Sequence, residues 1–134
     1  MKRSPIRSRS STERRRLEAE ADRLVQEASR LMWRGKCARC KCEGHVGHHI
    51  IGRANKQTRH QVLNVIYLCD PHHRQAHARP DAFMNWLKQY WYSIYEWHTV
   101  HKHLQPERVS AIHLKNTIAE LKQFIKRMED ENAN

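Results

Sequence analysis

The chain has 134 residues, which is enough for one domain with a modest core and terminal extensions. Lys and Arg number 25 against 14 Asp and Glu, a formal net charge of +11 at pH 7, so we expect a polyanionic partner, with nucleic acid as the leading candidate. No stretch approaches the roughly 18 apolar residues of a membrane span, and no hydrophobic segment follows the basic N-terminus as in a secretory signal. We therefore expect a cytoplasmic protein and no membrane association.

Residues 1–12 contain mostly Ser, Arg and Pro, with little apolar content. Such a segment cannot bury enough apolar surface to fold alone, so we expect a basic arm that is disordered until it meets a polyanion. The same composition is typical of an organellar transit peptide, which is the alternative interpretation of this basic segment. Residues 13–134 are predicted to form a single domain.

The first predicted helix spans residues 13–33 and ends near Gly35. Its apolar residues recur at intervals of four and three, which places them on one helical face: Leu17, Ala21, Leu24, Ala28 and Leu31.

Residues 36–69 contain cysteines, glycines and two short β-prone runs, HVGHHI at 45–50 and VIYLC at 65–69. We predict two brief strands there, joined by the polar loop GRANKQTRHQ at 52–61. Asp70 can cap a following helix with Pro71 at its first position, so the histidines after it should lie on a short helix that Pro80 ends.

Two more helices are predicted in the C-terminal half, at about 81–131. The first is expected to run unbroken from Asp81 to about Leu104, and the second from Ala111 to Met128, with Pro106 between them. In both helices the apolar residues recur with heptad-like spacing, and the pairing expected of the two is an antiparallel hairpin. The aromatic residues of 83–97 are expected in the core rather than on a platform for stacking bases.

The cysteines predict a metal site, because four cysteines in a reducing compartment do not favour disulfides. Cys37 and Cys40 have the spacing of a zinc knuckle, and Cys69 and His72 supply a second pair with two residues between them. A Cys3His structural zinc site results if the two segments meet. Cys42 is the alternate ligand to Cys40.

The remaining clustered histidines predict a second site. On a helix His73 and His77 lie about 40° apart and can hold one ion, whereas His72 is turned about 100° from His73 and can serve the zinc. In a strand His48 and His49 point to opposite sides, unless a bulge or a strand end turns both toward the site. One of them can be a ligand and the other a proton acceptor.

The stretch 37–77 resembles the HNH endonuclease module, a ββα-metal nuclease fold. The H, N and H of its name fall on His49, Asn64 and His73, which are separated by fifteen and nine residues, and His77 follows. The resemblance implies an α+β, mostly helical fold: a ββα-metal core at about 36–79 with a zinc knuckle, one N-terminal helix and a C-terminal helical pair.

The resemblance also implies a metal-dependent DNA endonuclease that hydrolyses phosphodiester bonds. His49 matches the general base, Asn64 the residue whose amide braces the loop between the strands, and His48, His73 and His77 the ligands of one catalytic divalent cation. That cation is Mn²⁺, Co²⁺, Ni²⁺, Zn²⁺ or Mg²⁺. Because His48 stands where Asp is commoner in the family, we expect a preference for transition metals over Mg²⁺.

DNA is the expected partner, and the closest resemblance within the family is to phage or prophage proteins of recombination or DNA packaging. Phage terminase or recombination proteins are then candidate partners in the host cytoplasm. Four cations near the histidines are candidate phosphate contacts, with a merely solvated face as the alternative: Arg53, Lys56, Arg59 and Arg74. The alternative functions are a non-catalytic zinc-containing DNA-binding adaptor and a pure scaffold.

Overall fold

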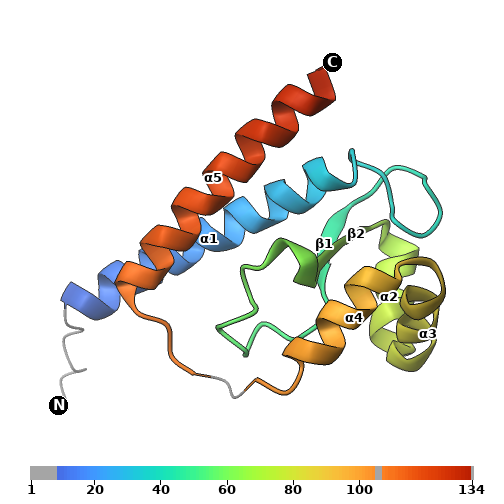
Figure 1. The fold of residues 1–134 in the computed structure, drawn as a ribbon, viewed down its shortest axis with the longest axis horizontal. Helices are drawn as coiled ribbons and strands as arrows, with labels where there is room; N and C mark the ends of the chain where they lie inside the picture. The colour runs from blue at the N-terminus through green and yellow to red at the C-terminus, as the bar shows by residue number, and fades with distance from the viewer. Residues whose placement is uncertain (1–8, 105–106, 134) are drawn as a thin grey trace, which may run out of the picture.

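The computed structural model describes residues 9–104 and 107–133, and the side chains from residue 11 onward. The elements in chain order are α1 (Arg9–Met32), β1 (Val46–His49), a single 3-10 turn (Val62–Asn64), β2 (Val65–Leu68), α2 (Asp70–Ala78), α3 (Pro80–Tyr90), α4 (Tyr92–His101) and α5 (Ala111–Ala133) (Figure 1). The chain is mostly helical with one small antiparallel sheet, as the sequence predicts.

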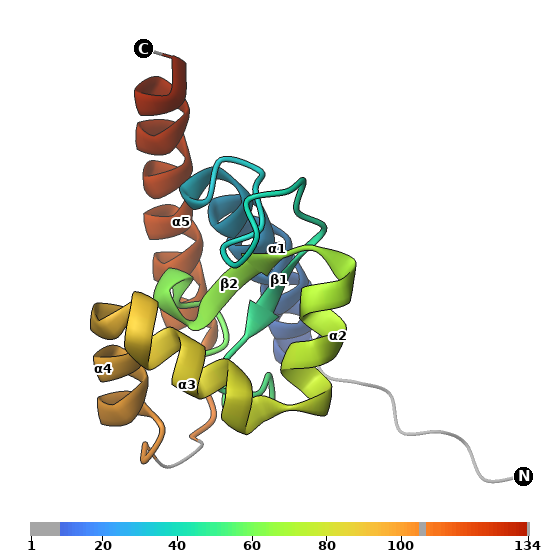
Figure 2. The same cartoon turned by 90° about the vertical axis from the view of Figure 1, so that its right-hand side faces the viewer.

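The two-stranded sheet lies at the centre of the molecule (Figure 2). Every residue of β2 is buried. Side chains alternate along a strand, so Val65 packs toward α1 and α5 while Ile66 and Leu68 pack toward α2, α3 and α4. The core is therefore divided by β2 into two halves. This double burial explains why VIYL is a continuous apolar run rather than an alternating one.

β1 is held between α1 and β2 by one glutamine and one glycine. The Gln26 side chain accepts from the Gly47 N–H at 2.8 Å and donates to the Gly47 carbonyl at 3.0 Å. A Cβ at Gly47 would collide with the Val65 side chain and the Gln26 amide oxygen, so this close approach requires glycine. The strand that carries His48 and His49 is thereby fixed against α1.

α1 and α5 pack side by side and run in the same direction (Figure 1). Glu13 near the start of α1 pairs with Lys115 near the start of α5 at 3.1 Å, and Asn132 at the end of α5 donates to the Leu31 carbonyl at 3.3 Å. These polar contacts are partly exposed and contribute little, so the apolar seam stabilises the pair. That seam consists of Ala21, Leu24, Val25, Ala28, Leu114, Ile118 and Leu121.

The expected hairpin of the two C-terminal helices is wrong. α5 packs on α1, and the segment 81–104 is two helices, α3 and α4, that pack against each other. The backbone leaves helical geometry at Trp91, with φ −136° and ψ 59°. Its indole packs edge-on against Trp33 at 4.7 Å between ring centroids. A heptad rhythm continues through this break because periodicity does not record such a tertiary contact.

Two predicted boundaries also differ. α1 begins at Arg9 rather than residue 13, so the last four residues of the expected basic arm are helical, while residues 1–8 lie outside the described part of the chain. In α2 the N-cap is Cys69 rather than Asp70, which stands at the first helical position.

The loop between the strands is tied to α1 by a carboxylate network. Arg59 donates to both oxygens of Asp22, at 2.8 and 2.7 Å, and pairs with Glu18 at 3.2 Å. His60 donates to Asp22 at 2.7 Å. Burial alone would raise the pKa of Asp22, but the hydrogen bonds from His60 and Arg59 and their charge outweigh it and hold that pKa well below its usual range. α1 thus sets the path of this loop.

None of the helices in the described residues combines the length and the apolar character that crossing a membrane requires.

Asp22→Asn should lower the free energy of unfolding at pH 7 by on the order of 2–3 kcal/mol, because Arg59 and His60 lose their shared carboxylate while staying largely enclosed. The folded-state pKa of Asp22 lies below its unfolded value, so this stabilisation is present above about pH 4 and is lost as the pH falls further. Urea denaturation of parent and variant between pH 7 and pH 3 should show the difference shrinking. The exposed Asp130 offers the control, Asp130→Asn, which should change neither curve; equal stability of parent and Asp22→Asn at pH 7 would disprove the network's role.

Candidate metal centres

The first half of a Cys/His cluster lies in a tight turn after α1, which we call the knuckle turn (residues 36–43). α1 ends because Arg34 and Gly35 adopt left-handed backbone conformations, and the Gly35 N–H donates to the Arg30 carbonyl at 2.8 Å. The Cys37 N–H then donates to the Cys42 carbonyl at 2.7 Å and closes the turn. This local geometry brings Cys37 and Cys40 to the same side.

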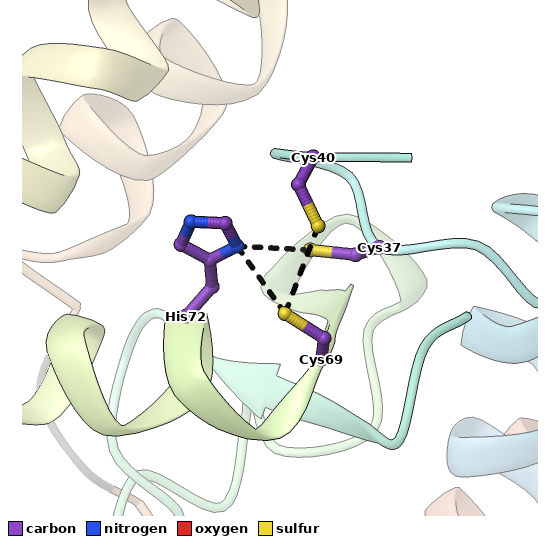
Figure 3. A group of neighbouring side chains, drawn as sticks. All are labelled: Cys37, Cys40, Cys69 and His72. Carbon is purple, nitrogen blue, oxygen red and sulfur yellow. Dashed lines mark hydrogen bonds between the residues drawn. The ribbon is translucent and has the colours of Figure 1, made fainter. Parts of the chain in front are cut away.

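The second half comes from the start of α2, where Cys69 is the N-cap and His72 lies in the first turn (Figure 3). The Sγ atoms of Cys40 and Cys69 are 3.7 Å apart, and His72 Nδ1 is 3.2 Å from Cys69 Sγ and 3.6 Å from Cys37 Sγ. A tetrahedral ion with Zn–S bonds of about 2.3 Å separates two sulfurs by roughly 3.8 Å. The four side chains therefore have the donor chemistry and spacing to hold one metal ion.

The protonation of the thiols fits such a site. Burial raises the pKa of Cys37, but backbone N–H groups of Cys69, Cys40 and Arg39 lower it further than burial raises it. Burial and the neighbouring thiols raise the pKa of Cys69 to about 11. A bound cation would lower the pKa of these thiols and favour their thiolate forms.

The sequence correctly preferred Cys40 to Cys42 as the fourth member. Cys42 is exposed and does not belong to the cluster. Its carbonyl accepts from the Cys37 N–H in the turn, and its thiol interacts with that of Cys40.

A second cluster consists of His48 on β1 and His73 and His77 on α2, whose ligand atoms lie within 4.8 Å of one another. The Nε2 atoms of His73 and His77 are 3.0 Å apart. A cation bonded to two imidazoles at about 2.1 Å holds their nitrogens roughly 3.0 to 3.4 Å apart. The spacing of four residues in α2 produces this pair, as the sequence predicts.

The surroundings of His48 and His73 favour the neutral imidazole, which is the form that binds metal. Burial, followed by the nearby His77 and His73, lowers the pKa of His48 to about 4. Burial also lowers the pKa of His73. The buried Nδ1 of His48 has no hydrogen-bond partner among the residues that the structure describes, a costly state that a ligand or a water molecule would relieve.

His49 faces the other side of β1, as strand geometry predicts. Its Nε2–H donates to the Arg59 carbonyl at 2.9 Å, so the neutral ring carries its free lone pair on Nδ1. Burial lowers the pKa of His49, although the bond to Arg59 opposes the change. His49 is therefore a neutral imidazole with one basic nitrogen available near pH 7.

Asn64 is fully buried and braces the loop that positions His49. Its Oδ1 accepts from the Ile51 N–H at 2.7 Å, and its Nδ2 donates to the Ile51 carbonyl at 3.0 Å and the Thr58 carbonyl at 3.1 Å. The Thr58 carbonyl directly precedes Arg59, whose own carbonyl holds His49. The brace that the resemblance assigns to Asn64 is thus present in the structure.

Both faces of β1 open into one cleft of about 380 Å³. Its lining contains all four histidines and four residues from α1 and the loop: His48, His49, His73, His77, Asp22, Gln26, Gly52 and Arg53, together with Val46 and Gly47. The sequence alone does not identify Asp22 or Gln26 as site residues. Both lie within a regular helix, and the sequence of a helix does not show which segment packs against it.

The four candidate phosphate contacts differ in availability. Arg59 is 12% exposed and committed to Asp22 and Glu18, and Lys56 pairs with Glu18 at 2.8 Å. Arg53 also pairs with Asp22 but is 58% exposed, and Arg74 is 79% exposed. Only Arg53 and Arg74 present their cations broadly to solvent.

The histidines without an expected role also have distinct places. His60 is buried against Asp22, which the loop sequence did not reveal, and His45 is exposed. In α4 the ring of His101 stacks on Trp97 at 4.2 Å, and its Nδ1–H donates to the Trp97 carbonyl. This is the helix packing expected of the C-terminal histidines.

Comparisons of the chain with protein-family models, curated proteins and solved structures found no significant match.

Cys69→Ser should lower the free energy of unfolding by at least about 3 kcal/mol and remove about one equivalent of tightly bound zinc, because metal binding contributes directly to folding here. Elemental analysis of the purified protein and thermal melts would measure both. Cys42→Ser is the matched control and should keep the metal and the melting temperature of the parent. A Cys69→Ser protein that melts like the parent, or a parent without bound metal, would contradict the assignment.

Proposed function

We propose that this protein is a metal-dependent HNH endonuclease that hydrolyses DNA phosphodiester bonds. The observation that carries the proposal is the convergence of the three imidazoles of His48, His73 and His77, in a cleft that also contains a fourth, oriented imidazole. The order of β1, the Asn64-braced loop, β2 and α2 supports a ββα-metal core. A purely structural metal site would not need His49.

His49 is the residue that we assign as general base. Its Nε2–H is held by the Arg59 carbonyl, so Nδ1 accepts the proton of the attacking water. Asn64 acts indirectly, because it holds the loop whose carbonyl orients the ring. A divalent cation bound by His48, His73 and His77 would supply stabilisation of the charge that develops on the phosphate and the departing oxygen.

The Cys37, Cys40, Cys69 and His72 cluster is proposed to hold zinc in a structural role. Four protein ligands leave no open position for water. Because the cluster joins the knuckle turn to the start of α2, it also holds the helix that carries His73 and His77.

DNA is proposed as the substrate from the net charge of +11 and the cations beside the cleft. Arg53, which lines the cleft, and Arg74 remain proposed phosphate contacts. Arg59 and Lys56 are better explained as anchors of the loop on α1. A phage-encoded role in recombination or packaging, with recombination or terminase proteins as partners, stays part of the proposal.

His49→Ala should lower the rate of plasmid cleavage by about 10²- to 10⁴-fold, because the proton acceptor is lost while the metal ligands remain. The assay is nicking or linearisation of supercoiled plasmid in Mn²⁺, with gel-shift affinity measured in parallel and expected to stay within about twofold. His113→Ala, on the exposed surface of α5, is the matched control and should cleave normally. Cleavage by His49→Ala at the parental rate would reject the base assignment. If the parent binds DNA but does not cleave it with any divalent ion, the protein is instead the non-catalytic adaptor.

Mn²⁺, Co²⁺ or Ni²⁺ should support more cleavage by the parent than an equal concentration of Mg²⁺, since a neutral all-imidazole site suits transition metals and Mg²⁺ prefers oxygen ligands. His48→Asp should shift that preference toward Mg²⁺. Initial rates across the ion series would measure both effects, and retained zinc would verify that the variant is folded. Greater activity of the parent with Mg²⁺ would remove His48 from the ligand set.

A further inference from the structure

We propose that a groove between the knuckle turn and α3 binds unpaired nucleotides of single-stranded DNA, so that the substrate has a single-stranded segment beside the site of cleavage. The choice of DNA rests on the proposed function, but the groove is separate from the cleft of the four histidines. It has a volume of about 690 Å³ and is lined chiefly by aromatic and basic side chains: Arg39, Lys41, His72, Trp86, Tyr90 and Trp91.

The aromatic side chains of this region belong only in part to the core, contrary to the expectation for residues 83–97. Phe83 and Leu87 of α3 are buried, but Tyr90 is 63% exposed. Trp86, one helical turn before Tyr90, is half-buried, and the two rings lie 6.4 Å apart at 37°. Exposed ring faces of this kind are what nucleic-acid bases stack upon without regard to sequence.

The cations of the groove lie over indole rings of this region. Arg39 Cζ is 5.7 Å from the Trp86 centroid, and Lys41 Nζ is 5.3 Å from that of Trp91 and 5.8 Å from that of Trp33. No carboxylate belongs to the groove lining in the described part of the chain. A cation held at an aromatic face can meet the phosphate of a nucleotide whose base stacks nearby.

The combination favours a nucleic-acid strand over an acidic peptide. An acidic peptide satisfies the cations but offers few planar groups for the exposed rings, whereas a single strand presents a base and a phosphate at every step. A duplex keeps its bases stacked inside, so its use of the groove would be limited to phosphate contacts. Unpaired nucleotides are the ligand that uses both features.

The position of the groove connects it to the cleft. His72 lines the groove while the adjacent His73 lines the cleft, and neighbouring residues of a helix point about 100° apart. The groove and the cleft therefore lie on two sides of α2. A DNA strand that is unpaired next to the scissile phosphate can continue around α2 from the cleft into the groove.

The test is fluorescence anisotropy of a labelled 15-nucleotide oligothymidine with the full chain, without added divalent cation, on the zinc-containing protein. Tyr90→Ala should weaken binding at least about fivefold, the lower limit for one lost base stack. Tyr92→Ala is the matched control, since Tyr92 is a tyrosine with 58% exposure that does not line the groove, and it should change the affinity less than twofold. Arg39→Gln should reduce the salt dependence of binding, whereas Lys88→Gln, an exposed cation of α3 outside the groove lining, should not.

Equal affinities of Tyr90→Ala and Tyr92→Ala, or no binding of oligothymidine by the parent, would overturn the inference. Self-association of the parent that Tyr90→Ala abolishes would also overturn it, because a second copy would then occupy the groove. Plasmid cleavage with Mn²⁺ separates this result from the proposed function. Cleavage of duplex plasmid by a parent that does not bind oligothymidine would support the nuclease function and reject strand binding in the groove. Binding of oligothymidine by a parent that does not cleave would support strand binding and reject the nuclease function.

Discussion

The attachment of α2 to the knuckle turn is the constraint on which both candidate metal centres depend. His72 faces Cys37 and Cys69, while the ring of the next residue, His73, lies 5.3 Å from that of His48 on β1. α2 therefore carries residues of both clusters. A rotation of α2 about its own axis would disturb both of them. A structural ion in the Cys/His cluster would hold the ligand geometry of the histidine cluster to within the small motions of one helical turn.

α1 supplies the second support of the histidine cleft. Gln26 fixes β1 through the backbone of Gly47, and Asp22 fixes the loop through Arg59, whose carbonyl orients His49. α1 thus positions His49, although His49 belongs to a different element and lies far from α1 in the sequence. α5 covers the remaining apolar surface of α1, and this close packing keeps α1 rigid. α5 itself does not line the cleft.

The distribution of charge follows from this support. The chain is strongly basic, yet carboxylates of α1 neutralise the loop cations next to the cleft, including Arg59 and Lys56. Arg53 stays accessible in the lining of the cleft, Arg74 is exposed on α2, and Arg39 and Lys41 line the groove. Net charge alone indicates an anionic partner, but the available cations indicate where such a partner would be held.

Local chemistry in the sequence determined the mostly helical class, the two short strands, the Pro-containing start of α2 and the two closely spaced pairs, Cys37 with Cys40 and Cys69 with His72. Each of these depends on residues within a few positions of one another, as does the His73 and His77 pair that one helical turn creates. The brace by Asn64 was accessible only through the resemblance to the HNH module, because nothing in the local sequence specifies that its amide bonds to Ile51, thirteen positions earlier.

Only the tertiary structure decided the break at Trp91, the parallel pairing of α5 with α1, the burial of Arg59 and the participation of Asp22. Heptad periodicity reports that a helix has an apolar face, but it does not say which partner covers that face or whether an indole such as that of Trp33 interrupts the helix. Charge in a sequence likewise does not reveal its partner: Asp22 and Arg59 are thirty-seven residues apart, and their bond exists because packing on β2 brings α1 against the loop. Contacts between distant segments depend on the whole packed core, and that is why the sequence predicted the members of both clusters but not the scaffold that holds them.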